Sequence, residues 1–330
     1  MNKKLEQVQK EALALCAPVF HEMEEISLYN TEKVLSAFRK HHLSAYHFAP
    51  SNGYGYGDPG REKLEEIWCD IFHAESALVR PHFVSGTHAL ATVLLALLEP
   101  GDTMVSAVGA PYDTMERVIG ITGNAPGNLI SKGVHYKEVP LKGNTYDLQA
   151  ISDAVDENTK LVEIQRSRGY MLRDSLFPSD IKKIIDTVKA KNPNTICFVD
   201  NCYGEFTNKE EPIELGADIT AGSLIKNAGG GLAPTGAYIC GRKDLVERCS
   251  YVWTAPGLGG EMGSYAASYR PFFEGLFLSP HMTRQAMMSA EFCAVVFKLI
   301  GFKTSPEPGH LRTDLITTVT LDSEENMCRF

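Results

Sequence analysis

The sequence predicts an α/β fold, with a large lobe built on a mainly parallel sheet covered by helices on both faces. The first observation is that short β-rich runs alternate with helical runs between about residues 61 and 242. The second is that Ser, Thr, Pro and Gly stand where these runs begin and end. The third is a change to long helical stretches after about residue 263, which indicates a smaller C-terminal α+β lobe.

These changes divide the chain into three parts. Residues 1–60 are predicted to form a helix pair and a Gly-rich loop, SNGYGYGDPGRE, which we interpret as an N-terminal helical arm and interface loop. Residues 61–262 form the large lobe, and residues 263–330 the small lobe. The small lobe stops at a helix start, EENMCRF, which indicates a truncated domain.

The predicted elements follow in order along the chain. Helices are expected at 61–72, 85–101, 112–123, 147–159, 177–193 and 281–302. Strands are expected at 76–80, 103–108, 134–140, 160–165, 195–200, 217–224, 236–242 and 314–322.

Composition excludes several classes of protein. The chain has 330 residues, a net charge of -9 and no basic block, which argues against nucleic-acid or anionic-membrane partners and favours small molecules. The N-terminal helix lacks the apolar core and cleavage site of a signal peptide, and the apolar segment 89–101 is too short to span a bilayer. We therefore expect a cytoplasmic protein.

Cysteine and histidine give no sign of a metal centre. The eight cysteines include no CxxC pair, so reduced, structural thiols are expected. His41 and His42 are adjacent, and adjacent side chains on a helix point apart. No metal is predicted.

Two features at strand and helix ends suggest ligand contacts. Asp200 directly follows the apolar strand of TICFVDNCYGEF; alone, it would more often be a turn former or helix cap. Ser85, Gly86 and Thr87 begin a helix after a strand, where free N–H groups and hydroxyls form either an anion cradle or an ordinary helix N-cap. In open α/β sheets both positions lie where ligands bind.

Lys226 is the third feature. It follows the apolar run ADITAGSL and precedes NAGGGLAPTG, so it is either a solvated loop cation or a desolvated amine beside glycines that allow close approach. A desolvated lysine is expected to have a lowered pKa and to attack carbonyls. Together, an amine, a carboxylate and phosphate donors match the needs of pyridoxal 5'-phosphate, with Lys226 as the Schiff-base lysine.

The chain also resembles a known family. The segments FVDNCYGEF, GADITAGSLIKNAGGG, APTGAYICGR, SRGY and YGYGDPGREKLE are similar to those of methionine gamma-lyase family proteins, also labelled aluminium resistance proteins. These belong to the Cys/Met-metabolism group of fold-type I pyridoxal-phosphate enzymes, which are aspartate-aminotransferase-like. The similarity extends from about Tyr46 over nearly the whole remaining chain.

The resemblance implies roles for individual residues. Lys226 would hold the cofactor and then act as acid and base at the substrate Cα, and Asp200 would pair with the pyridinium nitrogen. Gly86 and Thr87 through their N–H groups, and Ser223, would hold the phosphate, with Ser85 beside them.

The resemblance also assigns aromatic residues and an assembly. Tyr112 in VGAPYDTM would stack on the cofactor ring, although without the family a core or loop tyrosine is equally compatible. Tyr54 and Tyr56 resemble a loop that reaches across a dimer interface to the neighbour's phosphate. The active unit would then be a homodimer or homotetramer with shared sites.

The arginine that would bind the substrate carboxylate is not evident. Arg166 and Arg168 in EIQRSRGY are weak candidates for substrate or cofactor contacts, the alternative being surface charge. Arg312 does not lie in the motif that the family uses, and family members extend beyond residue 330.

The resulting hypothesis is a carbon–sulfur lyase that performs β- or γ-elimination on methionine, cysteine or a cystathionine-like amino acid. Transamination or aldol cleavage on the same cofactor is an alternative, as is a catalytically poor protein that keeps cofactor binding. A dinucleotide-binding oxidoreductase is disfavoured, because no GxGxxG follows the first strand of a βαβ unit.

Overall fold

The structure, a computed structural model that describes residues 3–330, contains a seven-stranded sheet in the order β1-β7-β6-β5-β4-β2-β3. Its strands are β1 (Ser76–Arg80), β2 (Thr103–Ser106), β3 (His135–Glu138), β4 (Thr159–Gln165), β5 (Ile196–Asp200), β6 (Ile219–Ser223) and β7 (Ala237–Gly241). Strand β7 pairs antiparallel with both neighbours, and the other pairs are parallel. The predicted α/β fold with a mainly parallel sheet is confirmed.

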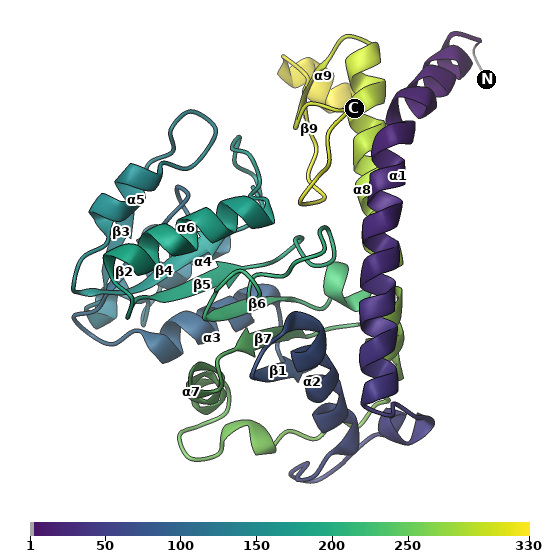
Figure 1. The fold of residues 1–330 in the computed structure, drawn as a ribbon. Helices are drawn as coiled ribbons and strands as arrows, with labels where there is room; N and C mark the ends of the chain where they lie inside the picture. Colours follow the sequence, from purple (N-terminus) through teal and green to yellow (C-terminus); the bar gives the residue numbers. More distant parts are fainter. Residues whose placement is uncertain (1–2) are drawn as a thin grey trace.

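Helices cover both faces of this sheet (Figure 1). Helices α3 (Gly86–Leu97), α4 (Asp113–Ile119) and α7 (Lys243–Trp253) contribute to one apolar core with residues of the central strands. Helices α5 (Leu148–Ala154) and α6 (Pro178–Lys191) form a second core on the opposite face. Strands β5, β6 and β7 are therefore buried on both sides, which explains their mostly apolar runs, whereas the edge strand β3 is polar and partly exposed.

The N-terminal arm differs from the sequence prediction. The predicted helix pair is wrong: α1 is one helix of 38 residues (Lys3–Lys40), and only a short 3-10 helix, η1 (Ala45–Phe48), follows it. Pro18 lies inside α1, where a proline costs about 3 kcal/mol or more. Burial of one apolar face of α1 against α8 offsets this cost.

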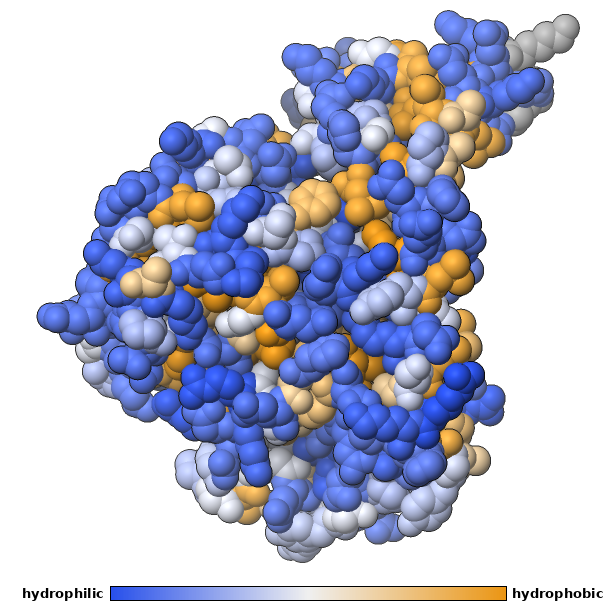
Figure 2. Space-filling view, in the orientation of Figure 1, coloured by the Kyte–Doolittle hydropathy of each residue, from blue (hydrophilic) through white to orange (hydrophobic). Residues whose placement is uncertain are grey.

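Helix α8 (Arg270–Leu299) runs antiparallel to α1, and the two lie side by side (Figure 1). Ser27 Oγ donates to the carbonyl oxygen of Pro280 at 3.1 Å, and Arg284 forms an ion pair with Glu24 at 3.0 Å. In the space-filling view, hydrophobic patches extend along this helical arm on an otherwise mostly hydrophilic face (Figure 2).

The remaining elements are short, apart from α2 (Pro59–Phe72), whose N-cap Asp58 accepts from the N–H groups of Gly60 and Arg61. Strands β8 (Lys303–Ser305) and β9 (Thr318–Thr320) form a two-stranded antiparallel sheet, so the predicted strand 314–322 is real but shorter. The others are η2 (Ile130–Lys132), η3 (Asn227–Gly229), η4 (Gly259–Glu261) and α9 (Glu324–Arg329). Over residues 3–330, no helix is both long and apolar enough to cross a membrane.

Candidate active site

A cavity of about 250 Å³ lies where strands β4, β5 and β6 end and helix α3 begins. Seven of the predicted site residues line it together: Ser85, Gly86, Thr87, Tyr112, Asp200, Ser223 and Lys226. They come from four separate segments of the chain. The carboxyl ends of parallel strands meet at one edge of a sheet, and this places them around one space.

The start of α3 forms one wall of the cavity. Ser85 is the N-cap, and its Oγ accepts a hydrogen bond from the N–H of His88 at 3.1 Å. The hydroxyls of Thr87 and Thr114 are 2.8 Å apart. The first N–H groups of a helix have no partner within the helix, so this wall offers donors and a partial positive charge to an anion.

Ser223, at the end of β6, faces that wall. Its side chain is 1% exposed, yet its Oγ has no hydrogen-bond partner in residues 3–330. A Cβ atom added to Gly86 would lie 3.1 Å from Cβ of Ser223, so the glycine keeps the space between them open. An unpartnered buried hydroxyl beside a helix N-terminus fits a phosphate oxygen as its missing partner.

Asp200 ends β5 and is buried. One carboxylate oxygen accepts from the N–H of Cys202 at 3.0 Å. Burial raises the pKa of the Asp200 carboxyl above its usual range, and the Cys202 N–H and the charge of Lys226 act in the opposite direction. A cationic ring nitrogen beside this carboxylate would stabilise its charged form.

Lys226 is half-buried and caps the 3-10 helix η3. Its Nζ lies 4.1 Å from the ring centroid of Tyr203 and 6.0 Å from that of Tyr112. Desolvation lowers the pKa of Lys226, but the neighbouring Cys202, Tyr203, Asp200 and Glu205 together raise it above its usual value. The expectation of a lowered pKa is therefore wrong for the ligand-free site, because acidic groups surround the amine.

Tyr112 precedes α4 and stacks on Tyr170, with ring centroids 5.7 Å apart and an interplanar angle of 23°. The hydrogen bond with Tyr170, followed by burial, raises the pKa of Tyr112 to about 12. Tyr112 is therefore a neutral phenol at physiological pH. Tyr112 lies on the cavity wall, and its stacking on a cofactor ring stays a prediction.

Eight further lining residues were not selected from the sequence, among them Gln165, Ser167, Cys202 and Tyr203. Gln165 Nε2 donates to the Ser167 carbonyl oxygen at 2.7 Å, while Gln165 Oε1 has no partner in the described chain. Gln165 ends a strand, so the rule that functional groups gather at strand ends, which identified Asp200, could also have identified Gln165. The position of Tyr203 depends on backbone dihedrals that the sequence does not display.

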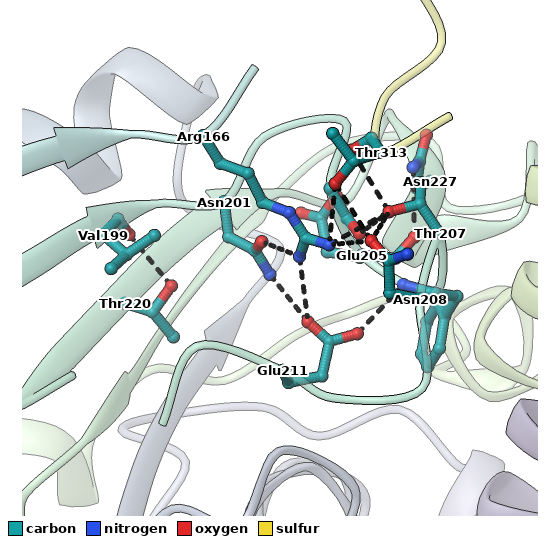
Figure 3. A network of polar contacts seen from close by, with 12 residues as sticks. Arg166, Val199, Asn201, Glu205, Thr207, Asn208, Glu211, Thr220, Asn227 and Thr313 are labelled. Atoms are coloured by element: carbon teal, nitrogen blue, oxygen red, sulfur yellow. Dashed lines mark hydrogen bonds and ion pairs between the residues drawn. The ribbon is translucent and has the colours of Figure 1, made fainter. Parts of the chain in front are cut away.

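Arg166 lies behind the cavity, in a buried polar cluster that we call the Arg166 core (Figure 3). Its members are Arg166, Asn201, Glu205, Thr207, Asn208, Glu211, Tyr238 and Thr313. Arg166 Nη1 donates to Asn201 Oδ1 at 2.8 Å, and Nη2 donates to Asn208 Oδ1 at 2.8 Å. The side chain does not line the cavity.

Arg168 and Arg312 also have internal partners. Arg168 donates to the Met171 carbonyl oxygen at 3.1 Å and to Ser305 Oγ at 2.8 Å, and it lines a different cavity of about 300 Å³ beside residues 306–314. Arg312 forms a buried ion pair with Glu291 at 3.0 Å. In the part of the chain that the structure describes, no arginine lines the Lys226 cavity.

Tyr54 and Tyr56 lie outside the cavity. They are 73% and 63% exposed, with ring centroids 6.2 Å apart. Arg61 Nη1 donates to the Gly55 carbonyl oxygen at 2.6 Å and fixes the loop that presents them. Their contact with a neighbouring subunit remains a prediction.

Within residues 3–330, no three His, Cys, Asp or Glu side chains are grouped closely enough to hold a metal ion. All eight cysteines are free thiols.

Comparison with solved structures first defines the class. The chain superposes on the pyridoxal-5'-phosphate dependent protein YhfS from Escherichia coli with a TM-score of 0.66, over 90% of this chain and 76% of that one. At 17% identity this likeness shows the fold alone, which is that of fold-type I pyridoxal-phosphate proteins. The cavity occupies the strand ends at which such folds bind ligands.

The family is then defined by sequence. The methionine gamma-lyase family profile matches residues 5–330, and the chain belongs to this family. It is 44% identical to the uncharacterized protein YnbB of Bacillus subtilis (strain 168), over 99% of this chain and 78% of YnbB. A structure described as a carbon-sulfur lyase involved in aluminum resistance, from Clostridium novyi NT, matches with 44% identity and a TM-score of 0.95, over 98% of this chain and 78% of that one.

Proposed function

We propose that this chain is a pyridoxal-phosphate-dependent carbon–sulfur lyase. Its substrate would be a sulfur-containing L-amino acid, such as methionine, cysteine or a cystathionine-like thioether. Elimination at Cβ or Cγ, followed by hydrolysis with one water molecule, would give a 2-oxo acid, ammonia and a thiol. The observation that carries this proposal is the convergence of Lys226, Asp200 and the Ser223 hydroxyl on one cavity at the start of α3.

The residues present fit the cofactor group by group. When bound, pyridoxal phosphate supplies an aldehyde that reacts with amines and a pyridinium ring that withdraws electrons from the amino-acid Cα. Ser223 Oγ and the first N–H groups of α3 would hold its phosphate, and the unpartnered state of that hydroxyl supports this role. Asp200 would hold the ring nitrogen, and Tyr112 would limit ring movement.

Lys226 would supply both the amine and the proton transfer. Because its pKa is raised in the ligand-free site, the ammonium form must lose a proton before the nitrogen can attack a carbonyl. With a substrate amine in the site, Lys226 Nζ would take the Cα proton and return a proton to a leaving group. Gln165 Oε1, which has no partner in residues 3–330, would offer a polar contact to a substrate on the β4 side.

The proposal is tested by incubating the purified chain with pyridoxal phosphate, reducing with borohydride and mapping the modified peptide. We expect the adduct on Lys226, its absence in Lys226→Ala, and its retention in Lys142→Ala, where an exposed loop lysine is removed. L-cystathionine, L-methionine and L-cysteine are then assayed for thiol and 2-oxo acid. A chain that forms no adduct at Lys226 would refute the proposal.

The same assay separates the alternative chemistry. Accumulation of pyridoxamine phosphate without thiol would identify a transaminase. Cofactor attachment without any turnover would indicate a protein that binds the cofactor but has little catalytic activity.

We also propose that the active unit is at least a dimer in which Tyr54 and Tyr56 approach the partner's site. The exposure of both rings on a loop fixed by Arg61 supports this. Sedimentation equilibrium would refute it by showing a monomer at assay concentrations.

A further inference from the structure

The turn after β5 has an unusual backbone. Tyr203 adopts φ = 67° and Phe206 adopts φ = 61°, both in the left-handed region. Residues other than glycine, asparagine and aspartate rarely occupy this region, because their side chains crowd the backbone there. Strain of this kind persists only where the surrounding structure enforces it, so it needs an explanation.

The Arg166 core enforces the turn. The N–H of Gly204 donates to the carbonyl oxygen of Asn201 at 2.8 Å, and the Asn201 side chain is held by Arg166. A Cβ atom at position 204 would lie 2.4 Å from Cδ of Arg166, so only glycine allows this approach. The turn between Asn201 and Glu205 therefore packs directly against the buried side chain of Arg166 (Figure 3).

The strained turn directs the ring of Tyr203 into the cavity. Tyr203 lines the cavity, and Lys226 Nζ lies 4.1 Å from its ring centroid. The ring centroid of Tyr112 is 6.0 Å from Lys226 Nζ, close to the outer limit of about 6 Å for a cation–π interaction. The amine therefore has one close aromatic contact and one distant one.

Other groups also face the amine. Asp200, Cys202, Glu205 and the ionisable hydroxyl of Tyr203 itself act on Lys226 through their charge or potential charge. In residues 3–330, however, Lys226 Nζ forms no ion pair with a carboxylate, and its short-range partner is the face of Tyr203. The ring is thus the group that fixes where the ammonium lies.

We propose that Tyr203 is a positioning residue for Lys226: its ring face binds the ammonium group in the ligand-free site and directs Nζ toward the cavity. The Arg166 core holds the strained turn, and the turn places this ring. The inference rests on the proposed function only in taking Lys226 as the reactive amine. It predicts that the ring, not the hydroxyl, stabilises the protonated form.

The test is competitive labelling of the full chain with trace acetic anhydride between about pH 7 and pH 11, where the labelling rate follows the fraction of free amine. Acetylation of Lys226 is quantified by mass spectrometry against the exposed Lys142. Tyr203→Asn removes the ring with a residue that tolerates left-handed φ, so folding is retained. Tyr203→Phe keeps the ring, and Tyr112→Asn removes the distant ring as a matched control.

We expect Tyr203→Asn to shift the labelling profile to lower pH and to raise the Lys226 rate at pH 8 by about two- to thirtyfold, the range given by cation–π energies. Tyr203→Phe should stay within about twofold of the parent chain, and Tyr112→Asn should change the rate less than Tyr203→Asn does. A cooperative urea transition checks that each variant is folded.

Two results would overturn the inference. One is a folded Tyr203→Asn variant with the parent labelling profile. The other is Tyr203→Phe behaving like Tyr203→Asn, which would assign the effect to the hydroxyl. Because acetylation needs no pyridoxal phosphate, the profiles report on Tyr203 even if the cofactor does not bind; failure of borohydride trapping at Lys226 would refute the proposed function alone.

Discussion

Two buried polar groups of residues lie next to each other at the ends of β4, β5 and β6, and they differ in how their polar atoms are partnered. In the Arg166 core, both η nitrogens of Arg166 donate to side-chain oxygens of the chain itself. In the Lys226 cavity, Ser223 Oγ and Gln165 Oε1 have no partner within residues 3–330. The Arg166 core bonds most of its polar atoms internally, with Arg166 Nε and Glu205 Oε2 as the exceptions, whereas the cavity has polar atoms that line a space open to a ligand.

The difference separates arginines that look alike in sequence. Arg166 follows a strand end, as a substrate-binding arginine could, but its partners are residues 201–211 and Thr313. Buried charges must be paired, and pairing inside the protein removes them from ligand binding. The core instead supports the cavity, because the turn that carries Asp200 and Tyr203 packs on Arg166.

The largest effect is expected from Arg166→Met. It leaves Glu211 buried without its cation and removes the hydrogen bonds to Asn201 and Asn208, so we expect the free energy of unfolding to fall by about 3–5 kcal/mol. Urea denaturation measures this loss. The exposed Arg117→Met is the matched control and should change stability by less than about 0.5 kcal/mol. Equal stabilities for the two variants would contradict the structural role of the core.

The next effect comes from Glu163, a buried carboxyl on β4 whose two oxygens have no partner in the described chain. Burial, and then the charge of Asp200, raise the pKa of Glu163 from 4.5 to about 8. The unfolded chain ionises Glu163 more easily, so this group lowers stability progressively as pH rises from about 4.5 to about 8. Glu163→Gln should remove that slope.

We expect Glu163→Gln to gain roughly 2–4 kcal/mol over the parent chain between about pH 5 and pH 8, relaxation making the gain smaller than the full shift implies. Urea unfolding at several pH values measures it. The exposed Glu22→Gln should run parallel to the parent chain. A constant difference between Glu163→Gln and the parent across this range would show that Glu163 has a partner for its charge.

The smallest effects are expected from two hydroxyls of strand β6, one without a hydrogen-bond partner and one with a partner. Ser223→Ala removes a hydroxyl without a partner, so we expect little change in stability but a loss of roughly 1.5–3 kcal/mol, about ten- to a hundredfold, in pyridoxal-phosphate affinity. Thr220 Oγ1 donates to the Val199 carbonyl oxygen at 2.9 Å, so Thr220→Val should cost about 1 kcal/mol in stability and leave affinity unchanged. Absorbance titration and urea unfolding measure both; unchanged affinity in Ser223→Ala would remove the serine from the phosphate site.

Much of the fold follows from local pattern. Most strands of the large sheet were predictable because they are short apolar runs bounded by turn residues, and the helix beginning at Gly86 was predictable because Ser85 caps it. The single helix α1 was not predictable, since it depends on contacts with α8 about 250 residues away. Local preference at Pro18 is outweighed by that distant packing.

The sequence by itself determined the α/β class, the family and the group of residues around Lys226, because strand ends in a parallel sheet meet at one edge whatever the details of packing. Only the tertiary structure decided the surroundings of each group: the acidic neighbours that raise the pKa of Lys226, the internal pairing of Arg166, and the strained turn that carries Tyr203. These properties depend on distances and burial between segments remote in sequence, and charge interactions in a buried site change steeply with both.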